Sequence, residues 1–420
     1  DYDPEEIKRG FSLQDAVAPI MWNDAKINVI DTPGYLDFSG EVMQAVRVAD
    51  SAVIVVDGKA GIEAGTELAW DHASDADIQK AFFVNKFDDP ECRFNRVFTQ
   101  LHDTFGVSVC PLMIPMVEGD KVTGFIKLID KKTYIYDKTG AHTEGDIPEE
   151  YMEIVDKYRD MLFEAIAGVS DELMEKYFAG EEYSPEEIKK AMKTGIKEGS
   201  IYPVMSGSAV DMVGIEQLLK FIISYTPEPK ADPNAPTAIK VFKTVADPFV
   251  GKMSYFKVLA GSVKQGDILT NKTSGVAEKM SKLYIIKGKK QTEVPEISAG
   301  DIGVVTKLQQ TSTKDILSAG KEDIPDIEIV YPKPCLSMAI YPKAKGDEEK
   351  ISQGLQKLKD EDLTFSYTTN PETHEQIISG LGEIHLDIIV NKLKTKFGVD
   401  VELKPPKVAY REAIRKKVEQ

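Results

Sequence analysis

The first 230 residues alternate short apolar runs with stretches whose apolar residues recur at helical spacing. Residues 26–30, 51–56 and 80–84 are the clearest apolar runs, and helical spacing appears at 40–48 and 64–73. A run that is apolar throughout is typical of a strand buried on both faces. Strands that alternate with helices indicate a parallel, doubly wound sheet. Ligands bind such sheets beyond the carboxyl ends of the strands, so chemistry is expected in the loops after these runs.

Residues 115–200 interrupt this alternation. The pattern there predicts a β ribbon at 121–136, followed by helices at 148–168, 171–178 and 185–197. A buried strand then resumes at 201–206. We interpret 115–200 as a subdomain inserted into a partial α/β domain that covers residues 1–230.

A linker rich in proline, residues 227–236, separates this domain from a region of closely spaced strands. The predicted strands are 238–246, 251–260, 261–269, 276–286 and 300–307. Short strands with turn signals and no helices predict an all-β domain, a β-barrel over residues 231–330.

Residues 331–407 follow a third pattern. Strands are predicted at 335–341, 363–369, 375–381 and 399–403, with helices at 347–359 and 383–397. The order β-α-β-β-α-β is that of a ferredoxin-like, α+β unit. A new apolar and basic stretch begins at residue 407.

Composition narrows the class of protein. The net charge is −17, which disfavours a protein that coats nucleic acid along its whole length. No run of ~18 uncharged apolar residues occurs, so we expect no membrane span. The three cysteines, Cys92, Cys110 and Cys335, are far apart and lack metal-ligand spacing, which indicates a reducing cytoplasm.

Three polar segments follow the predicted strands. Asp31-Thr32-Pro33-Gly34 follows the first run; its aspartate suits a Mg²⁺ held through water, and its glycine admits a terminal phosphate. Asn85-Lys86-Phe87-Asp88 follows the run at 80–84. The Asp88 carboxylate can accept from N1–H and the 2-amino group of guanine, a pair that adenine lacks, while Asn85 ties loops together and Lys86 covers the base.

The third segment is Ser206-Gly207-Ser208-Ala209, where the Ala209 N–H can donate to the guanine carbonyl. Each segment alone also suits an ordinary polar loop. Their order, and their position after buried strands, favour a guanine-nucleotide-binding fold.

These segments, taken with Arg9-Gly10-Phe11-Ser12-Leu13, Tyr35-Leu36-Asp37-Phe38 and Ser379-Gly380-Leu381-Gly382-Glu383-Ile384-His385-Leu386, resemble bacterial translation elongation factor G. The variants resemble its elongation-factor-G-like paralogues more closely. The resemblance covers the whole chain, and residues 408–420 resemble the start of a fourth domain. It implies a cytoplasmic, monomeric GTPase that couples GTP binding and hydrolysis to domain movement on the ribosome, with contacts to rRNA and ribosomal proteins.

The resemblance also implies GTP or GDP and Mg²⁺ as cofactors. The implied nucleotide-binding residues are Asp31, Thr32, Pro33, Gly34, Asn85, Lys86, Asp88, Ser208 and Ala209. Ser12, and Asp31 through water, would hold the Mg²⁺, and Tyr35 and Gly34 would lie at the hydrolysis site.

Two residues depart from the family pattern. Tyr35 stands where the family has the histidine that positions the attacking water, and a phenol with a pKa of about 10 is a poor base at neutral pH. Ser12 replaces a Mg²⁺-binding threonine and keeps its hydroxyl. We expect GTP binding to be retained in the parent protein and hydrolysis to be slower or differently triggered.

No G-x-x-x-x-G-K-[ST] phosphate-binding loop occurs in the 420 residues. The family places it just before Asp1, so we expect a chain cut at both ends that lacks the first strand of its sheet and is itself inactive. A GTP-dependent ribosome-binding module with little hydrolysis and a ribosome-protection factor remain alternatives. The acidic stretch 144–188 is either a solvated surface or a docking face for a ribosomal stalk protein. His385 is expected on the surface.

Overall fold

The computed structural model describes residues 3–118, 121–137, 141–247, 250–320, 324, 330–344 and 346–410. The chain divides into two compact units. Unit 1 comprises Asp1–Ile20, Asn28–Val48 and Lys230–Gln420, and unit 2 comprises Met21–Ile27 and Ala49–Pro229. Among the residues described, no helix is both long and apolar enough to cross a lipid bilayer.

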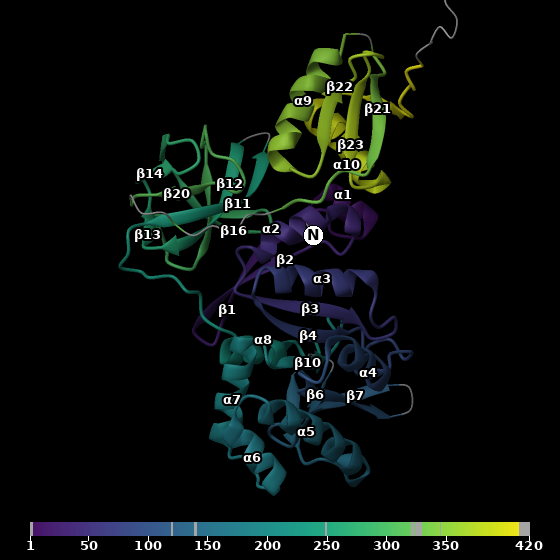
Figure 1. The fold of residues 1–420 in the computed structure, drawn as a ribbon, viewed down its shortest axis with the longest axis vertical. Helices are drawn as coiled ribbons and strands as arrows, with labels where there is room; N and C mark the ends of the chain where they lie inside the picture. The colour runs from purple at the N-terminus through teal and green to yellow at the C-terminus, as the bar shows by residue number, and fades with distance from the viewer. Residues whose placement is uncertain are drawn as a thin grey trace, which may run out of the picture. The chain divides into compact units, whose positions relative to one another are not determined.

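Unit 2 is built on a parallel four-stranded sheet in the order β3-β4-β10-β5 (Figure 1). The strands are β3 (Ser51–Asp57), β4 (Gln79–Asn85), β10 (Tyr202–Ser206) and β5 (Val109–Pro111). β4 is buried throughout residues 80–84, as its apolar run predicts. The predicted parallel α/β sheet is therefore confirmed for the runs 51–56, 80–84 and 201–206. Because Val84 pairs with Ser206, the loops that follow β4 and β10 leave the same edge of the sheet.

Three helices of unit 2 connect or follow these strands: α3 (Ala64–Asp75), α4 (Phe94–Phe105) and α8 (Ile215–Tyr225). Helix α4 is not among the helices predicted from the sequence. Its buried residues nevertheless recur at helical spacing: Phe94, Val97, Phe98 and Leu101.

The inserted region of unit 2 has its own antiparallel sheet in the order β6-β7-β8-β9. Its elements are β6 (Met113–Glu118), β7 (Lys121–Lys127), β8 (Lys132–Tyr136), β9 (His142–Gly145), η2 (Glu149–Tyr151), α5 (Met152–Ala167), α6 (Asp171–Ala179) and α7 (Pro185–Glu198). The ribbon and the three helices match the predicted ones. Leu162 and Met192 are fully buried and share one apolar core with the parallel sheet.

The N-terminal part of the chain contains α1 (Pro4–Arg9), β1 (Ala16–Trp22), β2 (Ala25–Asp31), η1 (Leu36–Phe38) and α2 (Ser39–Val46). β1 and β2 pair with each other as a separate two-stranded sheet, and β2 is at most partly buried. The prediction that the run 26–30 forms a buried strand of the parallel sheet is therefore wrong. α1 begins with a capping box at Asp3 and ends at Gly10, which adopts a left-handed conformation with φ +75°.

An antiparallel β domain follows in unit 1, with a main sheet of eight strands in the order β15-β14-β20-β11-β12-β19-β16-β17. The strands are β11 (Ala238–Asp247), β12 (Gly251–Ala260), β13 (Ser262–Lys264), β14 (Ile268–Asn271), β15 (Ala277–Lys279), β16 (Leu283–Lys287), β17 (Lys290–Val294), β18 (Glu296–Ser298), β19 (Ile302–Thr306) and β20 (Ile316–Ser318). β13 and β18 form a second, two-stranded sheet. Two predicted strands, 261–269 and 276–286, are each divided in two. Residues 321–323 and 325–329, at the end of the predicted domain, lie outside the described residues.

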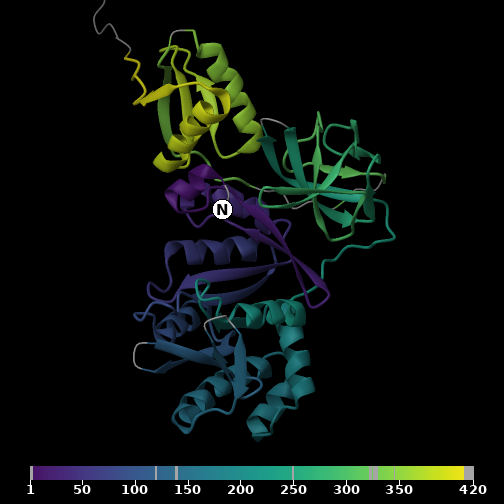
Figure 2. The same ribbon diagram turned by 180° about the vertical axis from the view of Figure 1, so that it is seen from behind.

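The α+β domain of unit 1 is the part drawn in yellow-green and yellow in Figure 2. Its sheet has the order β22-β23-β21-β24, with all pairs antiparallel. Its elements are β21 (Leu336–Pro342), α9 (Glu348–Glu361), β22 (Ser366–Thr369), β23 (Gln376–Gly380), α10 (Glu383–Phe397) and β24 (Val401–Lys404). Leu355 of α9 and Leu393 of α10 pack on Ile340 and Ile378 of the sheet. Of the predicted start of a fourth domain, residues 411–420 lie outside the described residues.

Candidate guanine-nucleotide site

The loop after β4 carries the predicted base-binding residues of unit 2. Asn85 ends the strand, and Lys86 adopts the left-handed conformation, with φ +71°, which is uncommon for a residue with a side chain. Phe87 is buried, and its N–H donates to the Gly207 carbonyl at 3.2 Å. The sharp turn at Lys86 and the buried ring at Phe87 leave Asp88 exposed at the rim of the loop.

Two hydrogen bonds join this loop to the loop after β10. The Asn85 Oδ1 atom accepts from the Ala209 N–H at 2.9 Å, and the Ser208 hydroxyl donates to Asp88 Oδ1 at 2.6 Å. Ser208 Oγ also accepts from the Asp211 N–H at 3.1 Å. The structure thus brings Asn85, Asp88, Ser208 and Ala209 together. The Ala209 N–H, expected to face guanine, is bonded to Asn85 here.

Lys86 forms an ion pair with Asp57 at the end of β3, with 2.7 Å between Nζ and Oδ2. The other oxygen of Asp57 accepts from the N–H groups of Lys59 and Ala60. Burial alone would raise the pKa of Asp57, but the bonds from Lys86 and the two amides outweigh it and lower that pKa to about 2. The sequence pattern did not single out Asp57, although it follows a buried run just as Asn85 does.

A glycine makes the loop after β10 possible. A Cβ atom at Gly207 would lie 2.3 Å from the Val213 carbonyl oxygen and 2.7 Å from the Phe83 ring. Only a residue without a side chain fits between these groups, so Gly207 sets the path of the chain into Ser208.

The segment 31–35, in unit 1, carries the predicted phosphate-side residues. Pro33 is buried, whereas Gly34 and Tyr35 are exposed, and no atom lies within 4 Å of the position that a Cβ of Gly34 would take. The Tyr35 ring lies 4.3 Å from the ring of Phe11. Tyr35 therefore rests on the segment that contains Ser12 and leaves the backbone of Gly34 open.

A buried carboxylate shapes the chain around Ser12. Glu6 of α1 accepts hydrogen bonds from the N–H groups of Leu13, at 2.9 Å, and Gln14, at 3.3 Å. Leu13 is buried with Phe38 and Ile388 in a small apolar cluster. These contacts fix both ends of the short stretch between α1 and β1.

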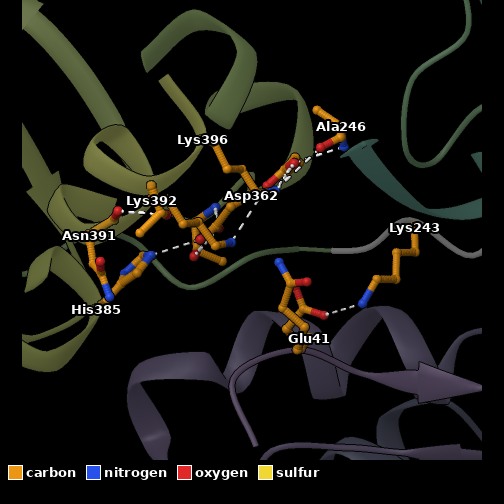
Figure 3. Close-up of polar contacts among 12 residues, drawn as sticks. Glu41, Lys243, Ala246, Asp362, His385, Asn391, Lys392 and Lys396 are labelled. Atoms are coloured by element: carbon orange, nitrogen blue, oxygen red, sulfur yellow. Dashed lines mark hydrogen bonds and ion pairs between the residues drawn. The ribbon is translucent and has the colours of Figure 1, made fainter. Parts of the chain in front are cut away.

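The expectation that His385 is a surface residue is wrong. His385 is 1% exposed, its Nδ1 accepts from the Leu381 N–H at 3.0 Å, and its Nε2 lies 2.8 Å from Asp362 Oδ2 (Figure 3). Burial would raise the pKa of Asp362, but bonds from His385 and Thr364 lower it to about 2. The imidazole is buried because these groups satisfy both of its nitrogens.

The fold and these loops define a class of protein: a guanine-nucleotide-type α/β domain followed by an antiparallel β domain and an α+β domain. Comparison with protein families agrees with this order. Residues 1–228 match the elongation factor Tu GTP binding domain, residues 236–320 match elongation factor G domain 2, and residues 331–405 match elongation factor G domain III.

The chain belongs to the family of translational GTPases with the elongation factor Tu GTP binding domain, and its domains are of the elongation factor G type. It is similar to the crystal structure of ttk003000868 from Thermus thermophilus, with 32% sequence identity and a TM-score of 0.89. The match covers 97% of this chain and 61% of that one, so the chain spans about 61% of its relative's length.

Proposed function

We propose that this chain is the nucleotide-binding and domain-coupling part of a ribosome-associated translational GTPase of the elongation factor G type. In this role it couples GTP binding and hydrolysis to domain movement during protein synthesis. The observation that carries the proposal is the pair of hydrogen bonds between the loops after β4 and β10, which holds Asp88 in place.

This geometry suits recognition of guanine. A carboxylate has about four acceptor positions, so the bond from Ser208 leaves room for N1–H and the 2-amino group of the base. Asn85 joins the two loops, and the Lys86 stem, anchored by Asp57, lies where it can cover a base. A fixed carboxylate discriminates well because a base without the matching donors leaves it unpaired.

The donors expected around Mg²⁺ are the oxygens of Asp31 and Ser12, both in unit 1. Desolvation, with a smaller contribution from the Glu6 carboxylate, raises the pKa of Asp31, and a bound cation would favour its ionised form. Carboxylate and hydroxyl oxygens are hard ligands of the kind Mg²⁺ prefers, so the donor chemistry of Asp31 and Ser12 suits the ion. When bound, Mg²⁺ neutralises charge on the β- and γ-phosphates.

The selectivity of Asp88 is tested by nucleotide competition in the full-length protein. We expect Asp88→Asn to weaken GTP binding by roughly 10²–10⁴-fold, because the amide presents donors to the donors of guanine. ITP, which lacks the 2-amino group, should bind the unaltered protein about tenfold or more weakly than GTP. Asp89→Asn, at the next residue of the same loop, is the matched control and should leave the affinity unchanged. Equal affinity for GTP and ATP would refute the assignment.

The 420-residue chain itself is expected to bind GTP poorly, because it contains no phosphate-binding loop to supply backbone amides and a lysine to the phosphates. Titration with a fluorescent GTP analogue should show no saturation up to the high micromolar range. Saturable binding at nanomolar to low micromolar concentration would show that the other loops are sufficient.

One observation favours a second function, GTP-dependent ribosome binding with little hydrolysis. Tyr35 stands at the position expected to orient the attacking water, and it is 47% exposed and rests against Phe11. A phenol can orient water through its hydroxyl but is a weak base near pH 7. In this function the nucleotide state controls ribosome affinity and turnover is slow.

Replacing Tyr35 with histidine distinguishes the two functions. We expect Tyr35→His to raise ribosome-stimulated GTP turnover in the full-length protein by roughly 10²-fold, the scale of positioned acid–base catalysis. Tyr35→Phe, which keeps the ring on Phe11 and removes the hydroxyl, is the control and should lower turnover. No rise with histidine would mean that Tyr35 does not limit hydrolysis.

A further inference from the structure

Helix α10 does not cap its own N-terminus. Its N-cap residue is Gly382, in extended conformation with φ −168°, and it has no side chain to accept from the first turn. The N–H of His385, the third helical residue, instead donates to Asp37 Oδ2 at 3.0 Å. A carboxylate from a residue 348 positions away in the chain therefore takes the place of an N-cap side chain.

Gly382 leaves the space that Asp37 occupies. A Cβ atom at Gly382 would lie 2.3–2.6 Å from the three carboxyl atoms of Asp37. Real Cβ contacts are never this short, so the carboxylate and a side chain at position 382 exclude each other. Since the φ of Gly382 is available to any residue, the glycine is required by this approach and not by backbone conformation.

The neighbouring residues hold both sides of the contact. Phe38 is 6% exposed and packs with Leu13 and with Ile388 of α10. On the α10 side, the His385 ring accepts a hydrogen bond from the Leu381 N–H and is hydrogen-bonded to the Asp362 carboxylate. Buried contacts therefore anchor the residues next to the carboxylate and next to the amide.

We propose that Asp37 is a positioning residue: by capping α10, it fixes the segment that contains Gly34 and Tyr35 to the α+β domain. Asp37 lies two residues after Tyr35, so the cap determines where the Tyr35 hydroxyl and the Gly34 N–H lie. Movement of segment 31–38 is then transmitted to α10 as loss or gain of its cap. This inference rests on the proposed function for its link to hydrolysis.

The test uses the full-length protein with Asp37→Ala, Asp37→Asn, Gly382→Ala and the double variant Asp37→Ala/Gly382→Ala. Hydrogen exchange of the His385 amide should accelerate about fivefold to tenfold in Asp37→Ala, and Asp37→Asn should restore protection because asparagine is also a good N-cap. Gly382→Ala should be disruptive alone but add little in the Asp37→Ala background, since the colliding carboxylate is then absent. Asp360→Ala removes an exposed carboxylate of α9 and serves as the control.

Ribosome-stimulated turnover supplies the second readout. Asp37→Ala should lower kcat roughly tenfold or more and leave the KM for GTP within about twofold, whereas Asp37→Asn should recover most of kcat. Unchanged His385 exchange, additive effects of the two alanine variants, or an unchanged kcat would each overturn the proposal. Failure of the proposed function would be recognised separately, because the unaltered protein would then hydrolyse no GTP. The hydrogen-exchange measurements would still test whether Asp37 caps α10.

Discussion

Replacement of Lys243 with methionine is expected to destabilise unit 1 by about 3–5 kcal/mol at pH 8, the usual result of removing one partner from a buried ion pair. Lys243, on β11, is buried with its Nζ 2.7 Å from Asp15 Oδ1. The same Nζ lies 3.4 Å from Glu41 Oε2 (Figure 3). The Asp15 side chain is 0% exposed. Methionine fills a similar volume but leaves two buried carboxylates facing each other.

Hydrogen exchange of the β11 amides and urea unfolding followed by circular dichroism would measure this loss. Lys282→Met is the matched control, because Lys282 pairs with Glu293 on the surface of the same domain at 3.0 Å, and exposed pairs contribute little. The destabilisation by Lys243→Met should shrink at pH 5, where a carboxylic acid can replace the lost charge pair. A loss equal to that of the control would show that the buried group contributes no net stability.

The cluster around Lys243 shows what local patterns cannot predict. The strand 238–246 was predicted correctly because its apolar residues lie close together in the sequence. Nothing in that stretch shows that Lys243 is buried, because its partners Asp15 and Glu41 lie more than 200 positions away. A lysine in a strand is ordinarily assigned to solvent, and the long-range pair reverses that assignment.

His385 was misassigned for the same reason. Helix 383–397 was predicted with the correct bounds, since its periodicity is local. The burial of His385 depends on Asp362, which directly follows α9 and lies 23 positions away, and periodicity does not detect such a partner. The proximity of the loops after β4 and β10 was easier to predict. The carboxyl ends of neighbouring parallel strands meet at one edge of the sheet, and this does not depend on contacts with remote parts of the chain. By contrast, α4 was missed although Phe94, Val97 and Leu101 carried the signal.

Stability is expected to fall as the pH rises from about 4.5 to 7, by about 3 kcal/mol for the contribution of Glu41 alone. Burial raises the pKa of Glu41; Lys243 opposes this effect and Asp15 adds to it, and the result is about 7, against an ordinary value of 4.5. The folded protein therefore binds more protons than the unfolded chain in this interval. The stabilisation is complete below the unfolded pKa and is lost as the pH passes the folded pKa.

Among the charged groups that face one another around Glu41, Glu41 itself is the one expected to change protonation between pH 4.5 and 7. Burial opposes the charge of Lys243, but Asp15 and Glu41 outweigh it and raise the pKa of that lysine well above its usual range, so the ammonium stays charged. Asp362, with a pKa of about 2, stays ionised. The Tyr331 phenol stays neutral because burial and these carboxylates raise its pKa.

Glu41→Gln isolates this contribution. Glutamine keeps an oxygen to accept from the Asp15 N–H, a bond of 2.8 Å in the unaltered protein, and cannot ionise. The difference in unfolding free energy between the two proteins, measured from pH 4.5 to 8 by urea denaturation, should change by about 3 kcal/mol in favour of the variant. Histidines that titrate in the same range cancel in the difference. A pH-independent difference would mean that Glu41 is ionised throughout, and that Lys243 alone balances both carboxylates.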